Sequence, residues 1–510
     1  MKNTLKLISL LLALLFVFTA LAACGSKPAE TTKPSEQTQK PAETDPRLAL
    51  EDGVPKDLSY NGETVTFFSR EDYDIYKYEI ACEELLNDTL YDAIHYRNID
   101  VENRLNVKIA NIRQMMYGGQ NVTLWNQALS TSVLTNTGDY DGAMIYTSQS
   151  SPLAKEGIYY NLLTLSSEYG GDGYFDFSKP WWNQSLVDEL SVFGAMFFAG
   201  GDVTVTEIAD LFAIVFNKDL FEEKFPEERV DGLYQSVRDG KWTIGKMTEY
   251  VSEVWDDLNS NGMIDAGDVV GIWTDAIPGG DGSDMDGWLY AMGLEITETN
   301  EYGEPELVLH THPNLVPAYE AVKKMFYSSP GSLAATESQL GDTTFVNGKI
   351  LFSNFVLKWG ENYRESDVTY GVLPIPKFNE EQADYRTTFV NTASSVILCS
   401  NLPDSRATML SAIIEVLSAE SYKQVTPAYF GTVLQGHYSK DFADAEMYDL
   451  IIRSTYFTFG YAYSSKSLGG IGTLFRDVSD TFDIQSTIDS KKDSWEQNLI
   501  DLLEALEAVS

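Results

Sequence analysis

After roughly its first tenth, this 510-residue chain alternates short apolar runs with amphipathic segments. Apolar runs predict strands over 64–69 (TVTFFS), 106–112 (NVKIANI) and 140–146 (YDGAMIY). Apolar residues recur at helical spacing in between, which predicts helices over 80–105 and 123–135. This alternation predicts an α/β fold with a mostly parallel sheet covered by helices. In such sheets, ligands bind beyond the carboxyl ends of the strands.

The pattern continues downstream with strands and then longer helices. Apolar runs predict strands over 213–218, 349–355 and 369–373. Helical spacing predicts helices over 405–419 and 493–508. We expect these last helices to cap the fold and not to form a separate domain.

The first 23 residues combine a charged start with a long apolar stretch. Lys2 and Lys6 precede an apolar run that reaches residue 23. A membrane-spanning helix needs about 20 apolar residues, so this run is marginal as an anchor and typical of a signal peptide. Small residues precede Cys24 (LAAC), which resembles a lipobox. We predict a lipoprotein signal peptide over 1–23 and lipid chains on Cys24; an uncleaved anchor and ordinary secretion are the alternatives.

The segment after Cys24 is rich in Pro, Thr, Glu, Gln and Lys and nearly free of large apolar residues. Such a composition cannot bury enough surface to offset the entropy lost on folding. We predict a flexible tether over 24–54. Two acyl chains hold a protein stably on a membrane, where one chain binds only marginally. The predicted location is therefore the outer face of the cell membrane.

The charge balance is strongly acidic. The chain has 36 basic and 76 acidic side chains, a formal net charge of −40 at pH 7. Cleavage after residue 23 would remove two lysines and no acid, which leaves a charge of −42. This field repels nucleic acid and anionic lipid, so we expect no nucleic-acid partner. The roughly 460 residues after the tether exceed what one core usually supports, so we expect two lobes.

Only two cysteines follow Cys24, namely Cys82 and Cys399. An extracellular setting permits a disulfide between them. However, Cys399 ends an apolar run that reads as a core strand. We expect two buried free thiols, with the disulfide as the alternative. Metal-binding cysteines are clustered in sequence, so we expect no metal site built on these two.

The segment 257–268 (DLNSNGMIDAGD) has the spacing of an EF-hand calcium loop. Such loops bind Ca²⁺ through oxygens at positions 1, 3, 5, 7, 9 and 12, and position 6 is Gly. The corresponding ligands are Asp257, Asn259, Asn261, Met263 through its backbone carbonyl, Asp265 and Asp268. Position 12 is Asp in place of the longer Glu, and two ligands are neutral Asn. We therefore expect weak binding and a structural role for Ca²⁺; the alternative is an Asx-rich turn that binds nothing.

Signatures of catalysis are scarce. The sequence contains no G-x-S-x-G, HExxH or P-loop. His310 and His312 could share one face of a strand and bind a metal, but no third ligand is near them in sequence. A surface strand is the simpler interpretation, and we expect no catalytic residues.

A family likeness depends on seven segments, each weak alone, whose order and spacing extend over nearly all of the chain after the tether. They are 178–182 (SKPWW), 198–202 (FAGGD), 214–220 (IVFNKDL), 240–243 (GKWT), the calcium-type loop continuing to 270–272 (VGI), 345–349 (FVNGK) and 370–377 (YGVLPIPK). Together they resemble extracellular solute-binding lipoproteins of bacterial ABC importers, in the carbohydrate-type, family 1-like branch.

The resemblance implies a two-lobed fold of the periplasmic-binding-protein type II class, with hinge crossovers between the lobes. Lobe 1 would hold 55–208 and about 392–435, and lobe 2 about 212–390 and 436–510. The resemblance also implies a monomeric binding protein and not an enzyme. It would close on an extracellular carbohydrate, expected to be an oligosaccharide, and deliver it to a membrane permease.

Sugar sites pair aromatic rings, which cover the apolar C–H faces, with polar side chains that bind the hydroxyls. Aromatic residues make up 12% of the chain, but most aromatics belong to the core. The informative ones lie beside loop residues or at strand ends. The ligand-binding candidates are Trp181, Trp182, Asp202, Trp288, Trp359, Tyr146, Asn354 and Asn391. The alternative is core packing for the tryptophans and a turn cap for Asp202.

Other functions use the same features. A binder of a peptide or small metabolite could have this scaffold, because fold does not determine ligand. A surface glycoside hydrolase needs only two carboxylates, and among 76 acids some pair always looks suggestive. A structural or adhesive protein would show repeats or long low-complexity regions, and only the tether qualifies.

Overall fold

The computed structural model describes residues 45–277, 282–363, 366–435, 442–478 and 482–510. The chain divides into two compact units, Met1–Ala49 and Leu50–Ser510. In the first unit, the described part contains one 3₁₀ turn, η1 (Pro46–Ala49). The predicted signal peptide and Cys24 lie outside the described residues. No helix within the described ranges has both the length and the apolar character needed to cross a bilayer.

The folded unit begins earlier than the predicted end of the tether. Asp52 is 1% exposed, and its carboxylate accepts hydrogen bonds from Arg104 at 2.6 and 2.8 Å. Val54 is also buried. The prediction that the tether reaches residue 54 is therefore wrong for its last residues, because an ion pair and an apolar contact hold them.

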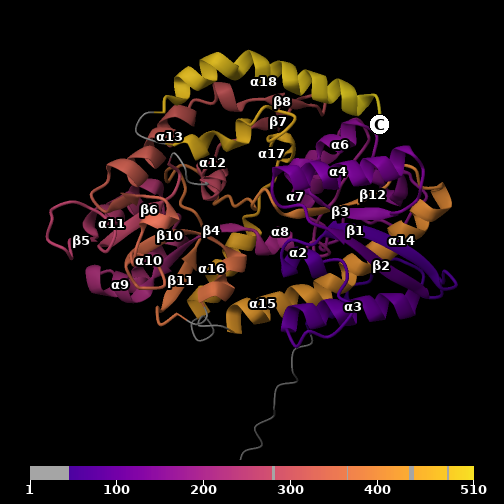
Figure 1. Ribbon diagram of the computed structural model, residues 1–510, viewed down its shortest axis with the longest axis horizontal. Helices are drawn as coiled ribbons and strands as arrows, with labels where there is room; N and C mark the ends of the chain where they lie inside the picture. Colours follow the sequence, from indigo (N-terminus) through magenta and orange to yellow (C-terminus); the bar gives the residue numbers. More distant parts are fainter. Residues whose placement is uncertain (1–44, 278–281, 364–365, 436–441, 479–481) are drawn as a thin grey trace, which may run out of the picture. The chain divides into compact units, whose positions relative to one another are not determined.

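The first sheet has four strands in the order β12-β3-β1-β2 (Figure 1). β1 (Glu63–Arg70) pairs in parallel with β2 (Val107–Gln114) and β3 (Gly142–Tyr146). β12 (Ser394–Leu398) is antiparallel to β3 because it enters after the chain returns from the second sheet. The last four residues of β1 are all buried, the polar Ser69 and Arg70 included.

Helix α3 (Thr89–Leu105) connects β1 to β2 and begins nine residues later than the sequence pattern predicted. The Asp88 side chain accepts hydrogen bonds from the N–H groups of Leu90 and Tyr91, which caps the helix there. Asn106 ends α3 in the left-handed region, with φ 49°. Polar capping residues therefore decide both ends of this helix.

The second sheet has the order β11-β4-β10-β6-β5, and β9 also pairs with β6. It is mixed, because β4 runs antiparallel to both β10 and β11 while β10 and β6 are parallel. The prediction of mostly parallel sheets therefore holds for the first sheet alone. The strand bounds are β4 (Phe212–Asn217), β5 (Trp255–Asp256), β6 (Val269–Thr274), β9 (Ser332–Ala334), β10 (Ile350–Val356) and β11 (Tyr370–Leu373), with a separate hairpin of β7 (Thr297–Thr299) and β8 (Pro305–Leu307).

Helices surround the two sheets and connect their strands. Their bounds are α2 (Asp74–Tyr78), α4 (Gly119–Leu134), α5 (Thr147–Ser150), α6 (Pro152–Lys155), α7 (Gln184–Leu190), α8 (Thr206–Ala209), α9 (Lys218–Lys224), α10 (Arg229–Arg238), α11 (Ile244–Glu253), α12 (Asp286–Ala291), α13 (Leu315–Lys323), α14 (Asp404–Glu420), α15 (Thr426–Gln435), α16 (Phe442–Arg453), α17 (Phe459–Tyr463) and α18 (Ile484–Glu507).

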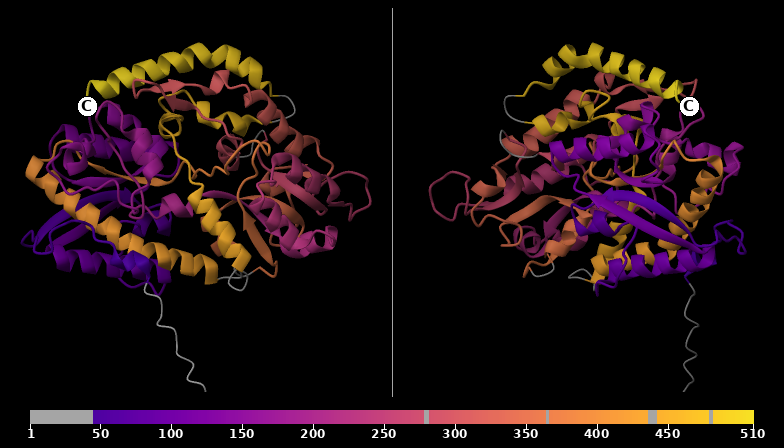
Figure 2. Two further views of the ribbon diagram at one scale, coloured as in Figure 1. Left: turned by 180° about the vertical axis from the view of Figure 1, so that it is seen from behind. Right: turned by 45° about the vertical axis from the view of Figure 1, so that its right-hand side comes forward.

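Two long segments connect the sheets: 147–211 leads from β3 to β4, and 374–393 leads back from β11 to β12. We call them the first and second crossovers. The last helix, α18, contacts α6, which follows the first sheet, and also α13 and β8 on the second-sheet side. It is the long yellow helix in both views of Figure 2. The predicted lobe boundaries stay a prediction. Helix α18 contacts elements connected to the first sheet and elements connected to the second.

Cys82 and Cys399 are free thiols and both are buried. Burial raises the pKa of the Cys399 thiol to about 12, so the thiol is protonated at neutral pH. The expectation of two buried free thiols is confirmed.

Candidate ligand-binding site

Strands β1 and β2 end side by side, and a tyrosine follows each end. Their parallel register is unbroken to the last residue of both strands. Tyr73, after β1, is 56% exposed, and Tyr117, after β2, is 55% exposed; their rings lie 6.0 Å apart, edge to face. The Asp72 Oδ1 atom accepts hydrogen bonds from the N–H groups of Met116 and Tyr117 at 2.7 and 2.9 Å. These bonds hold the loop after β2 against the loop after β1.

Arg70, the last residue of β1, is buried between two further tyrosines. Its guanidinium carbon lies 3.6 Å from the ring centroid of Tyr76 and 5.3 Å from that of Tyr146. Its Nη2 atom donates to the carbonyl oxygen of Thr392 at 2.7 Å and to the Oγ atom of Ser394 at 3.0 Å. A cation above aromatic faces is stabilised by the ring quadrupoles. These contacts connect the end of β1 to the second crossover.

The four tyrosines form a row from solvent to the crossovers. The rings of Tyr73 and Tyr76 lie 6.0 Å apart, edge to face. Tyr76 is 3% exposed and Tyr146 is 8% exposed, in contrast to the two outer rings. The Tyr146 hydroxyl, at the end of β3, donates to Asn391 Oδ1 at 3.2 Å. We call Tyr117, Tyr73, Tyr76 and Tyr146 the tyrosine row.

The inner part of the row is bonded to both crossovers and to the second sheet. Asp210 lies at the end of the first crossover and is fully buried. Lys358 follows β10, in the 3₁₀ helix η8 (Leu357–Tyr363), and its Nζ atom lies 2.6 Å from Asp210 Oδ1 and 2.6 Å from the Tyr76 hydroxyl. The Tyr76 hydroxyl and Thr392 Oγ1 donate to Asp210 Oδ2 at 3.0 and 3.2 Å. We call Tyr76, Asp210, Lys358 and Thr392 the crossover network.

The buried phenols of this region are neutral at pH 7. Burial, with the nearby Asp210 carboxylate, raises the pKa of Tyr76 well above its usual range. Burial also raises the pKa of Tyr146 to about 12, against the opposing effect of the Arg70 cation. Both hydroxyls therefore keep their protons and can donate hydrogen bonds.

Two of the candidates chosen from the sequence, Tyr146 and Asn391, lie at this strand end and bond to each other. Trp359 follows Lys358 in η8 and is partly buried against the core. These three residues lie near the site in the fold. Their role in ligand binding stays a prediction.

Trp181 and Trp182 lie in the interior and do not face solvent. They are 0% and 2% exposed. Their Nε1–H groups donate to the two carboxylate oxygens of Glu415, on α14, at 2.9 and 3.0 Å. In this structure both rings are packed in the interior, because two adjacent buried indole N–H groups need acceptors and Glu415 supplies both. Their role in ligand binding stays a prediction. Packing, the alternative that the sequence left open, describes their placement.

The remaining candidates are also buried. Asp202 is 8% exposed and accepts a hydrogen bond from Thr426 of α15. Trp288 is fully buried and donates through Nε1 to Asn354 Oδ1 at 2.9 Å. Asn354 lies inside β10 and also bonds to Asp284. Trp288 and Asn354 thus meet each other at the second sheet, apart from the tyrosine row.

Residues of the site that sequence reasoning missed are Arg70, Tyr73, Tyr76, Tyr117, Asp210, Lys358 and Thr392. Tyr73 and Tyr117 had a usable signal, because the strand-end rule that selected Tyr146 applies equally to the first residues after β1 and β2. Asp210 and Lys358 had none, because their contacts join residues 134 and 282 positions apart in sequence.

The segment 257–268 has a backbone that curls around its own side chains. Gly262, at position 6, has φ 74°, a left-handed conformation that favours glycine. The Asp257 carboxylate accepts from the N–H groups of Asn261 and Gly262 at 3.2 and 2.7 Å. Asp268, at position 12, is fully buried and accepts from the N–H group of position 2 at 3.0 Å. The first and last side chains are therefore directed inward.

Positions 3, 5 and 9 of this loop also converge. The Nδ2 group of Asn259 donates to Asp265 Oδ1 at 2.9 Å, and Asn261 bonds to the same carboxylate. Ile264, at position 8, packs against the core. Carboxylate, amide and carbonyl oxygens are the ligands that Ca²⁺ prefers.

The histidine pair is not on a strand. His310 lies in the 3₁₀ helix η5 (Leu309–Thr311), where its Nε2 atom is 3.1 Å from Glu496 of α18. His312 Nδ1 accepts from the N–H group of Asn314 at 3.2 Å. In the described part of the chain, no three His, Cys, Asp or Glu side chains are grouped to hold a metal ion, those of the calcium-type loop included. A calcium site in that loop would therefore also need its two Asn side chains and a backbone carbonyl.

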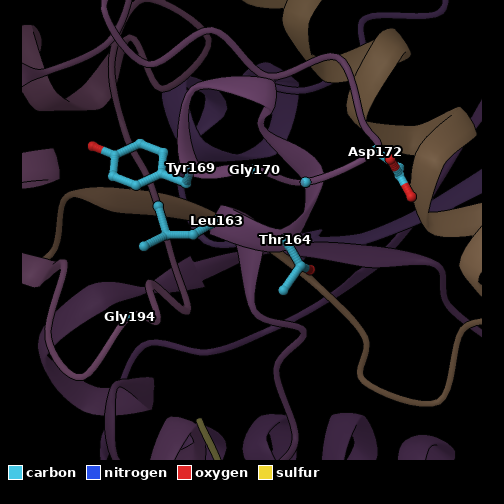
Figure 3. A pocket seen from close by; sticks show the side chains of 7 residues that line it. Leu163, Thr164, Tyr169, Gly170, Asp172 and Gly194 are labelled. Carbon is cyan, nitrogen blue, oxygen red and sulfur yellow. The ribbon is translucent and has the colours of Figure 1, made fainter.

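Two surface pockets lie apart from the tyrosine row, since none of the four tyrosines lines them. One pocket of about 380 Å³ lies in the loops after β3, and Figure 3 shows Tyr169 and Asp172 at its opposite ends with their polar atoms pointing apart. A pocket of about 700 Å³ lies beside the second crossover. Its Arg238 and Arg386 are already paired with acids.

No protein-family model matches this chain, and no curated protein matches it by sequence. Solved structures do match. An ABC substrate-binding protein of Listeria monocytogenes in complex with cycloalternan aligns over 86% of this chain and 99% of that chain, with TM-score 0.53 and 14% identity. A cyclic α-maltosyl-1,6-maltose binding protein of Arthrobacter globiformis aligns over 87% of this chain and 99% of that chain, with TM-score 0.53 and 13% identity. A receptor of Streptomyces glaucescens, solved unliganded and with acarbose, aligns over 86% of this chain and 99% of that chain, with TM-score 0.52 and 14% identity.

These likenesses establish the fold. The chain has the two-lobed α/β fold of solute-binding proteins, as the sequence predicted.

Proposed function

We propose that this chain is the substrate-binding component of an ABC importer, which captures an extracellular carbohydrate by closure of its two lobes and delivers it to a membrane permease. The observation that carries the proposal is the tyrosine row with Arg70, at the carboxyl edge of the first sheet and bonded to both crossovers. Further support comes from the three similar structures, which are proteins described with cycloalternan, cyclic α-maltosyl-1,6-maltose and acarbose as their ligands.

The chemistry of the site suits a sugar. Aromatic rings can cover the apolar faces of a sugar, while the polar groups at the inner end of the row, Asn391 and the side chain of Lys358, can bind hydroxyls. Closure suits the crossover network, because a hinge between the two sheets moves the two crossovers and Lys358 relative to Tyr76. A ligand that replaces or strengthens these bonds would shift the equilibrium between open and closed forms.

A thermal-shift screen of mono- and oligosaccharides tests the proposal. A sugar present at a hundred times its Kd should stabilise the protein by about 2.7 kcal/mol, seen as a higher melting temperature and checked by calorimetry. A panel without any stabilising carbohydrate would contradict the proposal. A shift with peptides or small metabolites alone would favour the other solutes that the sequence left open.

The proposal assigns no catalytic step to the chain. Incubation with oligosaccharides, followed by chromatography, should therefore return them uncut. Release of shorter products would favour a surface glycoside hydrolase instead.

The membrane anchor at Cys24 is part of the proposal. Support comes from the small residues before Cys24 and the apolar run that precedes them. Cys24→Ala should release the protein from the membrane fraction into the medium, because the lipid chains would be lost. Retention of the variant on the membrane would contradict lipid anchoring. Size-exclusion chromatography of the released protein should show a monomer.

Calcium binding by 257–268 is a second, separate proposal, with a structural role for the ion. It is supported by the left-handed Gly262 and by the inward carboxylates of Asp257 and Asp268. Calorimetry with CaCl₂ should show heat in the protein and none in Asp257→Asn, and a chelator should lower the melting temperature of the wild type only. Identical traces for both proteins would support an Asx-rich turn.

A further inference from the structure

Helices α2 and α8 lie side by side, and side chains at two levels connect them (Figure 1). Glu79, immediately after α2, accepts hydrogen bonds through Oε1 from the N–H group of Thr206 at 2.9 Å and from its hydroxyl at 2.6 Å. Three residues earlier, Tyr76 donates to Asp210 at 3.0 Å. The Thr206 hydroxyl also accepts from the N–H group of Ser394 in β12 at 3.0 Å. The position of α8 therefore depends both on Glu79 and on the crossover network.

A second carboxylic acid faces Glu79 from α8. Glu207 follows Thr206 in the helix and is 4% exposed, while Glu79 is fully buried. The Oε1 atom of Glu207 packs against Gly200, where an added Cβ atom would clash with it. In the described part of the chain, nothing donates a hydrogen bond to the Oε2 atom of Glu79, so that oxygen has no donor to stabilise a negative charge. Two acids on neighbouring elements are thus buried together.

The charged groups that face this pair are Arg70 from the end of β1, Arg97 from α3 and Asp202 from the first crossover. Arg97 donates to the backbone carbonyl oxygen of Glu79 at 3.1 Å. Burial raises the pKa of Glu79 against the effect of Arg70. Burial, with the carboxylates of Glu79 and Asp202, raises the pKa of Glu207 to about 8. In this arrangement Glu207 therefore holds a proton at pH 7.

We propose that Glu79 and Glu207 form a proton-operated latch on the first crossover. While Glu207 is protonated, α8 stays against α2 and Asp210 stays at Tyr76. When the proton leaves to solvent, the second negative charge beside Glu79 drives α8 away from α2. Helix α8 also contacts η8, which carries Lys358, so its release loosens the crossover network from both sides. The link to ligand binding rests on the proposed function: a loosened network weakens closure of the lobes in alkaline solution.

Hydrogen exchange followed by mass spectrometry tests the latch without any ligand. Amide protection of a peptide covering 203–211 is measured between about pH 6 and pH 9 and corrected for the intrinsic exchange rate. In the wild type the protection should fall about tenfold per pH unit up to about pH 8 and then level off, because each opening releases one proton. In Glu207→Gln the protection should change by less than about twofold per pH unit, since Gln cannot ionise.

Glu415 supplies the matched control. It is also buried, and burial raises its pKa to about 8 as well, but it lies on α14 and accepts hydrogen bonds from Trp181 and Trp182. Glu415→Gln should therefore keep the wild-type pH dependence in the peptide 203–211. Its own effect should appear in peptides of α14.

Glu79→Gln is the second variant, because Gln can still accept from Thr206 but carries no charge beside Glu207. Its protection of 203–211 at pH 8 should exceed that of the wild type. An unchanged slope in Glu207→Gln would overturn the latch. Equal slopes in every peptide of the wild type would also overturn it, since they would report unfolding of the whole chain. The experiment contains no saccharide, so these results are distinct from a failed saccharide screen, which would overturn the proposed function.

Discussion

Glu207, on α8 in the first crossover, is a carboxylic acid held in the interior. It is 4% exposed, and its Oε2 atom accepts from Asn183 Nδ2 at 3.0 Å. Burial, with the nearby carboxylates of Glu79 and Asp202, raises the pKa of Glu207 from its ordinary 4.5 to about 8, against the opposing effect of the hydrogen bonds from Asn183 and Thr204. The folded protein therefore holds a proton on Glu207 at pH 7, while the unfolded chain does not.

The direction of the pH dependence follows from this difference. Between about pH 4.5 and pH 8 the folded state binds more protons than the unfolded state, so the free energy of unfolding falls as pH rises. At 1.36 kcal/mol per pH unit, the loss from pH 4.5 to pH 7 is about 3 kcal/mol. Below pH 4.5 the contribution of Glu207 is fully present, and above pH 8 it is lost.

Glu207→Gln tests this reasoning because Gln cannot ionise and can still accept from Asn183. We expect the variant to be more stable than the wild type at pH 7, by up to about 3 kcal/mol. The assay is urea unfolding at several pH values from 5 to 8, and the slope of free energy against pH should fall by one proton. A residual slope will persist, because burial also raises the pKa of Glu415 to about 8. The exposed Glu301→Gln is the control, and parallel slopes for wild type and Glu207→Gln would refute the assignment.

Three further predictions concern the crossovers and α18. Gly201→Ala should prevent folding or lower the melting temperature sharply, because a Cβ atom there would lie 2.1 Å from a backbone carbonyl oxygen; a wild-type melting curve would contradict this. Trp495→Ala in α18 should lower the free energy of unfolding by about 3–5 kcal/mol, since Trp495 is 2% exposed. Ile500→Ala in the same helix should lower it far less, because Ile500 is 49% exposed. Equal losses in urea titrations would contradict this packing. Asp210→Asn should destabilise the fold by about 2 kcal/mol and weaken sugar binding, because buried Asp210 loses its charged hydrogen bond with Lys358, whose side chain is 23% exposed. Unchanged urea and calorimetric titrations would show that the network is dispensable.

Local sequence pattern was enough to predict most strands of the two sheets, although β5, β6 and β9 were not among them. β1 was expected at 64–69 and lies at 63–70, and β10 was expected at 349–355 and lies at 350–356. Strands buried on both faces consist of apolar runs, so a few adjacent residues are enough to locate them. The helix ends were less accurate. α18 begins at Ile484, nine residues before the predicted start, because the Asp483 side chain caps it there by accepting from the N–H group of Ser486.

By itself, the sequence determined the class of fold, the two buried thiols and the position of a calcium-type loop, because each depends on composition or on spacing within a short segment. The tertiary structure decided which aromatic residues are available. In sequence, Trp181 and Trp182 lie beside a loop and resemble stacking platforms for a sugar. In the folded chain both of their N–H groups donate to the buried carboxylate of Glu415, more than 230 positions away. Tyr73 and Tyr117 lie 44 positions apart and meet only because β1 and β2 pair in full register. The burial of a side chain and its hydrogen-bond partners depend on residues distant in sequence. For that reason the candidate binding surface could be identified only in the folded chain.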